Sequence, residues 1–165
     1  MTNQEAKKIF DNLLEDWCRE LRLHFEESLI GILQFGSTTK DYLKFETDID
    51  LMFLFTQIPK NRRDRFKLLN EFEVSLSRDL YSKLPNYNIV ISPLFRVPSD
   101  LNTFSVLYLD MVEHSVIRFD SEGLLKTTIE RTKSWIQKSG SYKVHQGTKW
   151  YWVLNPNGTN GNIDW

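Results

Sequence analysis

Apolar residues recur along this chain with two different spacings, and these spacings separate predicted helices from predicted strands. A capping box formed by Thr2 and Glu5 precedes apolar side chains spaced three or four residues apart, which predicts a first helix to about residue 25. The stretches 29–35 and 49–55 are instead almost continuously apolar, which is typical of buried strands. The first third of the chain is therefore expected to fold as one helix followed by two neighbouring strands.

The rest of the chain repeats these patterns. A second helical spacing begins at Phe66 and predicts one long helix that ends near residue 84. Residues 87–92 form the next strand pattern, which Pro93 is expected to stop or to place at an edge. Further along, the pattern predicts a helix over 104–113, a strand over 115–119 and a helix over 121–138 closed by Gly140. This order predicts the α+β class, with a small mixed β-sheet flanked by helices.

Chain length and the C-terminal composition set the expected domain organisation. With 165 residues, the sequence predicts a single domain over 1–165 that can bury a core without disulfides. Its last part, 141–165, mixes turn-forming Asn and Gly with the aromatic side chains of Trp150, Tyr151, Trp152 and Trp165. Because Trp150 and Trp152 are two residues apart, they share a face in an extended segment. We therefore expect an aromatic-rich tail that is held to the body by its rings.

Charge and cysteine content narrow the function classes. The net charge is −1, so the chain has no overall basic field of the kind that drives non-specific nucleic-acid binding. Cys18 is the single cysteine, which excludes an intrachain disulfide and fits a reducing compartment. The sequence starts without a signal-peptide pattern and contains no apolar stretch of membrane-spanning length. The expectation is a cytoplasmic protein with no membrane partner.

Two carboxylates at the start of the second strand carry the clearest chemistry. Asp48 and Asp50 are separated by Ile49, so in a strand both side chains share one face, with roughly 6–7 Å between their α-carbons. Like charges on one face repel each other unless a cation or a hydrogen-bond donor relieves them. Carboxylate oxygens at this spacing suit Mg²⁺ carried by a triphosphate, because Mg²⁺ needs only one or two protein carboxylates. The pair predicts a metal site for phosphoryl or nucleotidyl transfer.

A Gly-Ser turn closes the preceding strand and is expected to face these carboxylates. Gly36 lets the backbone approach a phosphate closely, and Ser37 can donate a hydrogen bond to a β- or γ-phosphate oxygen. A short helical segment over 37–43 would turn further backbone N–H groups toward the phosphates. Lys40 lies near enough in sequence to neutralise triphosphate charge, and a solvated surface lysine is the alternative.

In these residues the chain resembles the minimal nucleotidyltransferases of the DNA polymerase β-like superfamily. The signature of that family is a strand ending in Gly-Ser, an interval of ten residues, and Asp-x-Asp in an apolar strand, as in 35–51 here. The resemblance implies that Asp48 and Asp50 bind a pair of Mg²⁺ or Mn²⁺ ions and that Gly36, Ser37 and Lys40 bind an NTP. The implied reaction is transfer of an NMP to a hydroxyl group of an unidentified acceptor.

The sequence departs from this family in its third acidic residue. Members usually place a further Asp or Glu on a neighbouring strand, whereas the matching strand here offers only Asn88 and Ser92. Asp110 and Glu113 are the nearest acidic candidates downstream, and charges on a helix surface are their alternative interpretation. Asp41 stands where many members have Gly. The missing carboxylate predicts a loosely held second metal and slow transfer.

Besides the NTP, the sequence suggests two possible macromolecular partners, a toxin protein and RNA. Antitoxins of this superfamily partner small helical toxins of the ribonuclease type, so the resemblance leaves open an antitoxin or binding module that adenylylates or covers such a toxin. RNA is the other candidate partner, because a run of cations opens the predicted second helix, where cations oppose the helix macrodipole. A solvated face is the favoured alternative for this run. The cations are Lys60, Arg62, Arg63, Arg65 and Lys67.

Overall fold

The computed structural model describes residues 1–147 and 149–154, and its centre is a four-stranded mixed sheet. The strand order is β3-β2-β1-β4, with β2 and β3 parallel and the other neighbours antiparallel. The α+β fold class and the small mixed sheet expected from the sequence are therefore confirmed. The strands are β1 (Leu29–Phe35), β2 (Glu46–Phe55), β3 (Asn88–Arg96) and β4 (Ser115–Asp120).

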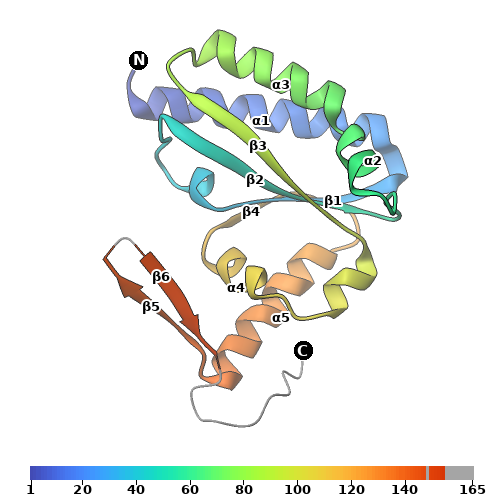
Figure 1. The fold of residues 1–165 in the computed structure, drawn as a ribbon, viewed down its shortest axis with the longest axis vertical. Coiled ribbons are helices and arrows are strands. Elements are labelled where there is room, and N and C mark those ends of the chain that lie inside the picture. The colour runs from blue at the N-terminus through green and yellow to red at the C-terminus, as the bar shows by residue number, and fades with distance from the viewer. Residues whose placement is uncertain (148, 155–165) are drawn as a thin grey trace.

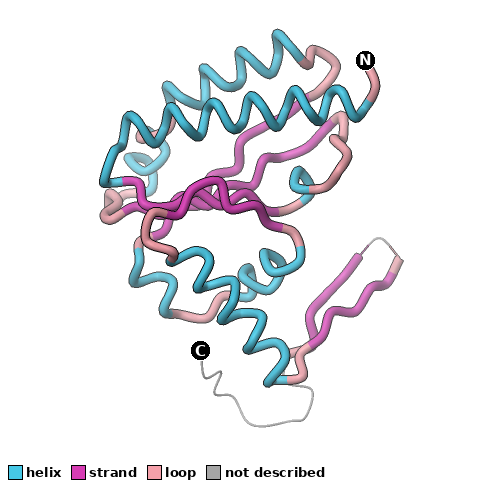
Figure 2. The backbone as a smooth tube through the Cα atoms, turned by 180° about the vertical axis from the view of Figure 1, so that it is seen from behind, coloured by secondary structure: helices cyan, strands magenta, loops and turns pink. Residues whose placement is uncertain are grey.

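Helices cover both faces of this sheet (Figure 1, and from behind in Figure 2). On one face lie α1 (Asn3–Phe25) and α3 (Asn70–Lys83), and on the other lie α4 (Val106–Glu113) and α5 (Leu124–Ser139). Buried side chains form two corresponding clusters, because alternate residues of each strand point to opposite faces. None of the helices in the described part of the chain is long and apolar enough to cross a bilayer.

The first helix begins and ends as its spacing predicts. Thr2 and Glu5 form the capping box, and the buried face includes Trp17 and Cys18. The indole Nε1 of Trp17 donates a hydrogen bond to the backbone oxygen of Phe72 at 2.7 Å, which ties α1 to α3. Burial raises the pKa of the Cys18 thiol to about 12, so this thiol is neutral and unreactive in the folded protein.

The long second helix expected from the spacing is wrong, since the structure splits it in two. α2 (Arg62–Lys67) ends early, and the N–H groups of Leu68 and Leu69 bond to carbonyl oxygens only three residues back. A separate helix, α3, then starts after Leu69, whose side chain is fully buried. Hydrophobic spacing reports which side chains face the core, so it continues across a break in the backbone hydrogen bonding.

For the third strand, the edge alternative is confirmed and the stop at Pro93 is wrong, because β3 continues through Pro93 to Arg96 at the edge of the sheet. Pro93 aligns with Leu51 of the parallel neighbour β2, and β3 is the outer strand of the sheet. An edge strand tolerates proline, because only one of its sides must pair with a neighbouring strand.

The first part of the expected aromatic tail forms a β-hairpin. Its strands are β5 (Tyr142–Gln146) and β6 (Lys149–Val153), which pair antiparallel beyond the end of α5. Gly140 ends α5 in the left-handed conformation, as predicted for the helix stop. Trp165 and the rest of 155–165 lie outside the described residues, and the single-domain assignment stays a prediction.

Candidate active site

Gly36 is the turn by which the chain leaves β1, and its conformation brings it directly against Asp50. Its φ of 77° and ψ of −155° lie in a region that essentially only glycine adopts. A Cβ at this position would collide with Oδ2 of Asp50. The carbonyl oxygen of Gly36 accepts a hydrogen bond from Thr39 Oγ1 at 2.8 Å, which closes the turn. Glycine is therefore required here by the neighbouring carboxylate, a reason that the sequence does not reveal.

Asp48 and Asp50 lie in the first half of β2, on the same face of the sheet. Asp50 is half-buried and aligns with Phe35 on β1 and Ser92 on β3, whereas Asp48 is exposed. Burial raises the pKa of Asp50, the negative charge of Asp48 raises it further, and a hydrogen bond from Ser92 partly opposes this. The two carboxylates therefore repel each other in the protein alone, and a divalent cation would relieve that repulsion.

The donor set at this corner suits a hard cation. It consists of two carboxylates, with the hydroxyl groups of Ser37 and Ser92 nearby, and it includes no sulfur ligand. Mg²⁺ is typically bound by one or two carboxylates together with waters and substrate phosphates, so two aspartates fit a metal that arrives with a triphosphate. In the described residues, no group of three or more His, Cys, Asp or Glu side chains is close enough to hold a metal ion.

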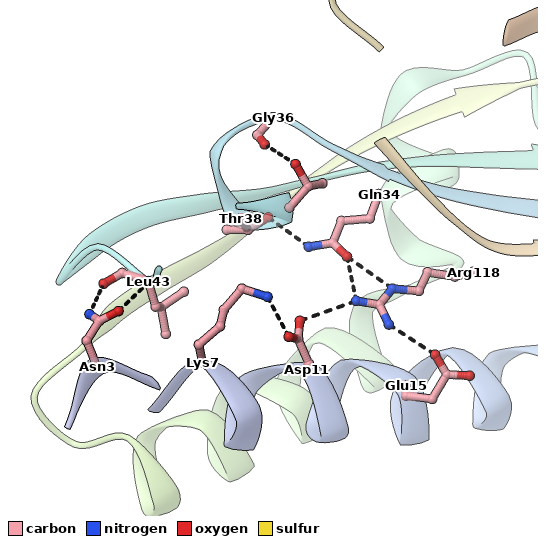
Figure 3. A network of polar contacts seen from close by, with 10 residues as sticks. Asn3, Lys7, Asp11, Glu15, Gln34, Gly36, Thr38, Leu43 and Arg118 are labelled. Atoms are coloured by element: carbon pink, nitrogen blue, oxygen red, sulfur yellow. Dashed lines mark hydrogen bonds and ion pairs between the residues drawn. The ribbon is translucent and has the colours of Figure 1, made fainter. Parts of the chain in front are cut away.

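The segment after Gly36 is shorter than the helical stretch expected over 37–43. Only Ser37–Thr39 forms a 3₁₀ turn, and the Ser37 hydroxyl lies 3.0 Å from the Thr47 hydroxyl on β2. Leu43 is buried instead of helical, because the side chain of Asn3 bonds to both its backbone N–H and its carbonyl oxygen. Figure 3 shows this clamp between the start of α1 and the loop. Asp41 is exposed on that loop.

A buried polar network supports the turn from below (Figure 3). The buried Thr38 hydroxyl accepts a hydrogen bond from Gln34 Nε2 at 3.0 Å, and Gln34 Oε1 accepts two from Arg118, at 2.7 and 3.0 Å. The Arg118 guanidinium in turn pairs with Glu15 at 3.1 Å and Asp11 at 3.4 Å. The network joins α1, β1 and β4 beneath the Gly36 turn. Its signal in the sequence was Gln34, the single polar side chain inside an apolar strand.

The Gly-Ser corner forms one wall of a cavity of about 600 Å³. Gly36, Ser37, Lys40 and Asp50 line it, so the structure brings these four predicted site residues together. Asp48 lies two residues away on β2, at the exposed start of the strand. The opposite wall comes from α4 and from the β5–β6 hairpin. That volume lies within the range of about 300–1,000 Å³ that is usual for small-molecule sites.

The hairpin pairs with both downstream carboxylates that were candidates for the third acid. Asp110 lines the cavity, but its Oδ1 accepts a hydrogen bond from Trp152 Nε1 at 3.0 Å and lies 3.3 Å from Lys143 Nζ. Glu113 pairs with the same ammonium at 2.6 Å. On the neighbouring strand, the position aligned with Asp50 is held by Ser92. The strand neighbour of Asp50 on β3 is therefore a serine, and both downstream acids are engaged by the hairpin.

The basic run of α2 belongs to a different place in the molecule. Lys60, Arg62 and Arg65 line a second cavity of about 290 Å³ together with Arg96, at the outer edge of β3. None of these four residues lines the cavity of Asp50, and Lys67 pairs with Asp64 on its own helix. The structure therefore does not bring the basic run to the predicted nucleotide site.

Sequence reasoning missed the residues of the opposite wall. Lys143, His145 and Trp150 line the cavity beside Asp50, although they come from a segment expected to be a structural tail. The available signal was Gly147 between two short segments, 142–146 and 149–153, which is compatible with a hairpin turn.

Comparison with known proteins yields one sequence relative and several solved structures. No family model matches the chain. A curated protein of Methanocaldococcus jannaschii, named "Putative protein adenylyltransferase", is 26% identical over 146 residues, which cover 87% of this chain and 95% of that protein.

Three of the similar solved structures are described as toxin–antitoxin complexes. One is a toxin–antitoxin with AMP-PNP, at 19% identity and a TM-score of 0.45, covering 75% of this chain and 87% of that one. Another is the MntA–HepT complex, at 16% identity and a TM-score of 0.45, covering 78% and 92%. A third contains a tri-AMPylated HEPN toxin of Shewanella oneidensis with an MNT antitoxin, at 16% identity and a TM-score of 0.44, also covering 78% and 92%.

Proposed function

We propose that the protein is a minimal nucleotidyltransferase of the DNA polymerase β-like superfamily and that it moves AMP from Mg-ATP to a hydroxyl group of a protein. The observation that carries the proposal is the contact of Gly36 with Asp50 at the wall of a nucleotide-sized cavity. The name of the Methanocaldococcus relative supports ATP as the nucleotide and a protein as the acceptor.

Each residue of the corner has a defined part in this proposal. Asp48 and Asp50 would hold Mg²⁺, which supplies charge neutralisation on the phosphates when bound. The backbone of the Gly36 turn and the Ser37 hydroxyl donate hydrogen bonds to phosphate oxygens. Lys40 lines the same cavity and offsets the remaining negative charge.

The chemical step is an in-line displacement at the α-phosphorus. The acceptor oxygen forms a new bond to phosphorus while the bond to the bridging oxygen breaks, and pyrophosphate leaves with the electron pair. The acceptor proton passes to solvent, since Ser92 stands where a carboxylate could take it. Catalysis then rests on positioning and charge neutralisation, and without a general base we expect slow turnover.

The test is a thermal-shift titration with the four NTPs, each with and without Mg²⁺. Mg-ATP at about 100 times its Kd should raise the free energy of unfolding by about 2.7 kcal/mol. Asp48→Ala and Asp50→Ala should each remove most of that gain, while Asp64→Ala, an acid on α2, should keep it. A double Asp48→Ala/Asp50→Ala variant that responds to Mg-ATP like the parent would show that the metal assignment is wrong.

The acceptor is tested with ATP labelled on its α-phosphate, with transfer of label to protein as the readout. The antitoxin hypothesis stays a prediction of the family resemblance, and co-purification separates it from the others. A stoichiometric small helical partner that becomes labelled identifies an antitoxin that adenylylates its toxin. Nucleic-acid absorbance in the purified sample would instead favour an RNA partner.

A further inference from the structure

We propose that the β5–β6 hairpin forms the nucleobase subsite of the cavity and that the base stacks on Trp150. This inference rests on the proposed function, since it assigns the part of the nucleotide that lies beyond the phosphates. The predicted phosphate ligands occupy one wall of the cavity, and Trp150 lies on the opposite wall.

The hairpin register gives its two faces different chemistry. Lys143 aligns with Trp152, and His145 aligns with Trp150, so these four side chains share one face. Three of them, Lys143, His145 and Trp150, line the cavity of Asp50. Tyr151, which aligns with Val144, belongs to the other face. The face toward the cavity therefore offers an aromatic surface together with cationic and imidazole groups.

Side-chain contacts fix the hairpin against α4. Lys143 is only 10% exposed, and its ammonium lies between the carboxylates of Glu113 and Asp110. Trp152 donates from its indole nitrogen to the same Asp110. These contacts use Trp152 as the anchor of the hairpin, and they position Trp150 in advance of ligand binding.

Trp150 itself is 47% exposed, although it lines the cavity. Trp17 in the core is 2% exposed by comparison, so the exposure of Trp150 leaves a large apolar surface open at the cavity. The Lys143 ammonium lies 4.0 Å from the centroid of the Trp150 ring, a cation–π contact that holds the indole in place. An indole held in this way provides a flat platform for another ring.

A nucleobase is the ring that the cavity favours. The cavity of about 600 Å³ has the Gly-Ser turn and Lys40 on one side and the Trp150 platform, with Lys143 beside it, on the other. A nucleotide has the matching polarity, with charged phosphates at one end and a flat ring at the other. Stacking on an aromatic side chain accepts any base, because every base has a π-face, so this subsite would add affinity for the base rather than strict selection of it.

The experiment compares the binding of two probes, Mg-ATP and Mg-tripolyphosphate, by calorimetry on the full chain. Trp150→Ala should weaken Mg-ATP binding by about tenfold and leave tripolyphosphate binding unchanged. Trp150→Phe should recover part of the loss. Tyr151→Ala is the matched control, since it removes a ring from the same strand on the other face, and it should bind Mg-ATP like the parent.

Three other results would overturn the proposal. Unchanged Mg-ATP binding by Trp150→Ala would place the base elsewhere while leaving the proposed function intact. Equal weakening of both probes would show that the variant disturbs the phosphate site and that stacking is not the cause. Failure of the parent protein to bind Mg-ATP would overturn the proposed function, and this subsite with it.

Discussion

The two walls of the cavity are built by different means. The sheet wall is fixed by backbone: the β1–β2–β3 register aligns Phe35, Asp50 and Ser92, and Gly36 leaves no space for a Cβ beside the carboxylate. The hairpin wall is fixed by side chains, through Lys143, Trp152 and their partners on α4. In the proposed function, the chemistry that demands fixed geometry would lie on the backbone-built wall. Recognition of the rest of the nucleotide would lie on a wall that a few side-chain substitutions can change.

The largest effect is expected from adding an acid next to Asp50 on the sheet wall. Ser92→Asp places a carboxylate next to Asp50, so it should tighten Mg²⁺ binding and raise the transfer rate by about 10²-fold, the lower end of general-base effects. Label transfer from ATP measures the rate. Asn88→Asp is the control, because Asn88 aligns with Glu46, and it should change nothing. Fast transfer by the parent that collapses in Asp110→Asn would instead assign the third acid to α4.

Gly36→Ala breaks the sheet wall at its tightest point. The new Cβ must displace the Asp50 carboxylate, and the backbone conformation becomes strained by about 1–3 kcal/mol. Chemical denaturation should show that loss, and Mg-ATP should no longer stabilise the protein. Gly147→Ala serves as the control, since it also has a positive φ but nothing within 4 Å of its Cβ. Retained Mg-ATP stabilisation in Gly36→Ala would mean that Asp50 does not need its present position.

Lys143→Met breaks the hairpin wall while keeping most of the side-chain volume. The loss of an ammonium shared by Asp110 and Glu113 should cost about 1 kcal/mol and should accelerate amide exchange in 142–146 and 149–153. The exposed Lys149→Met is the matched control and should exchange like the parent. Unchanged exchange in Lys143→Met would show that Trp152 alone holds the hairpin.

The smallest effect concerns the charge of Asp50 in metal-free buffer. Burial and the nearby Asp48 raise the pKa of Asp50, so the folded protein retains a proton that the unfolded chain releases. Stability contributed by this group is therefore present at low pH and is lost as the pH rises through the raised pKa. Asp50→Asn should be more stable than the parent at pH 7 by a few tenths of a kcal/mol, and the difference should vanish below about pH 4. An equal or larger difference at pH 3.5 would contradict this.

The sequence predicted the backbone-built wall far better than the other. Local spacing alone placed β1, the Gly36 turn and the two aspartates, since each depends on residues within one short segment. It failed where distant residues decide the outcome. Leu69 ends one helix by packing into the core, and β3 tolerates Pro93 because no strand lies beyond it. Lys143 is held at the cavity by its ion pairs with acids on α4. Such contacts join segments far apart in the chain, and no local pattern contains them.

The position of β4 has a consequence for how the chain folds. β1 is fully buried, yet its second neighbour in the sheet comes from residues 115–120, about 80 residues later in the chain. Until that segment docks, β1 presents an open edge of unpaired N–H and C=O groups on an apolar strand, the kind of surface that recruits other chains. Arg118, which also completes the network under the turn, arrives with the same segment. We therefore expect a chain truncated before residue 115 to aggregate, because β4 would no longer cover the open edge of β1.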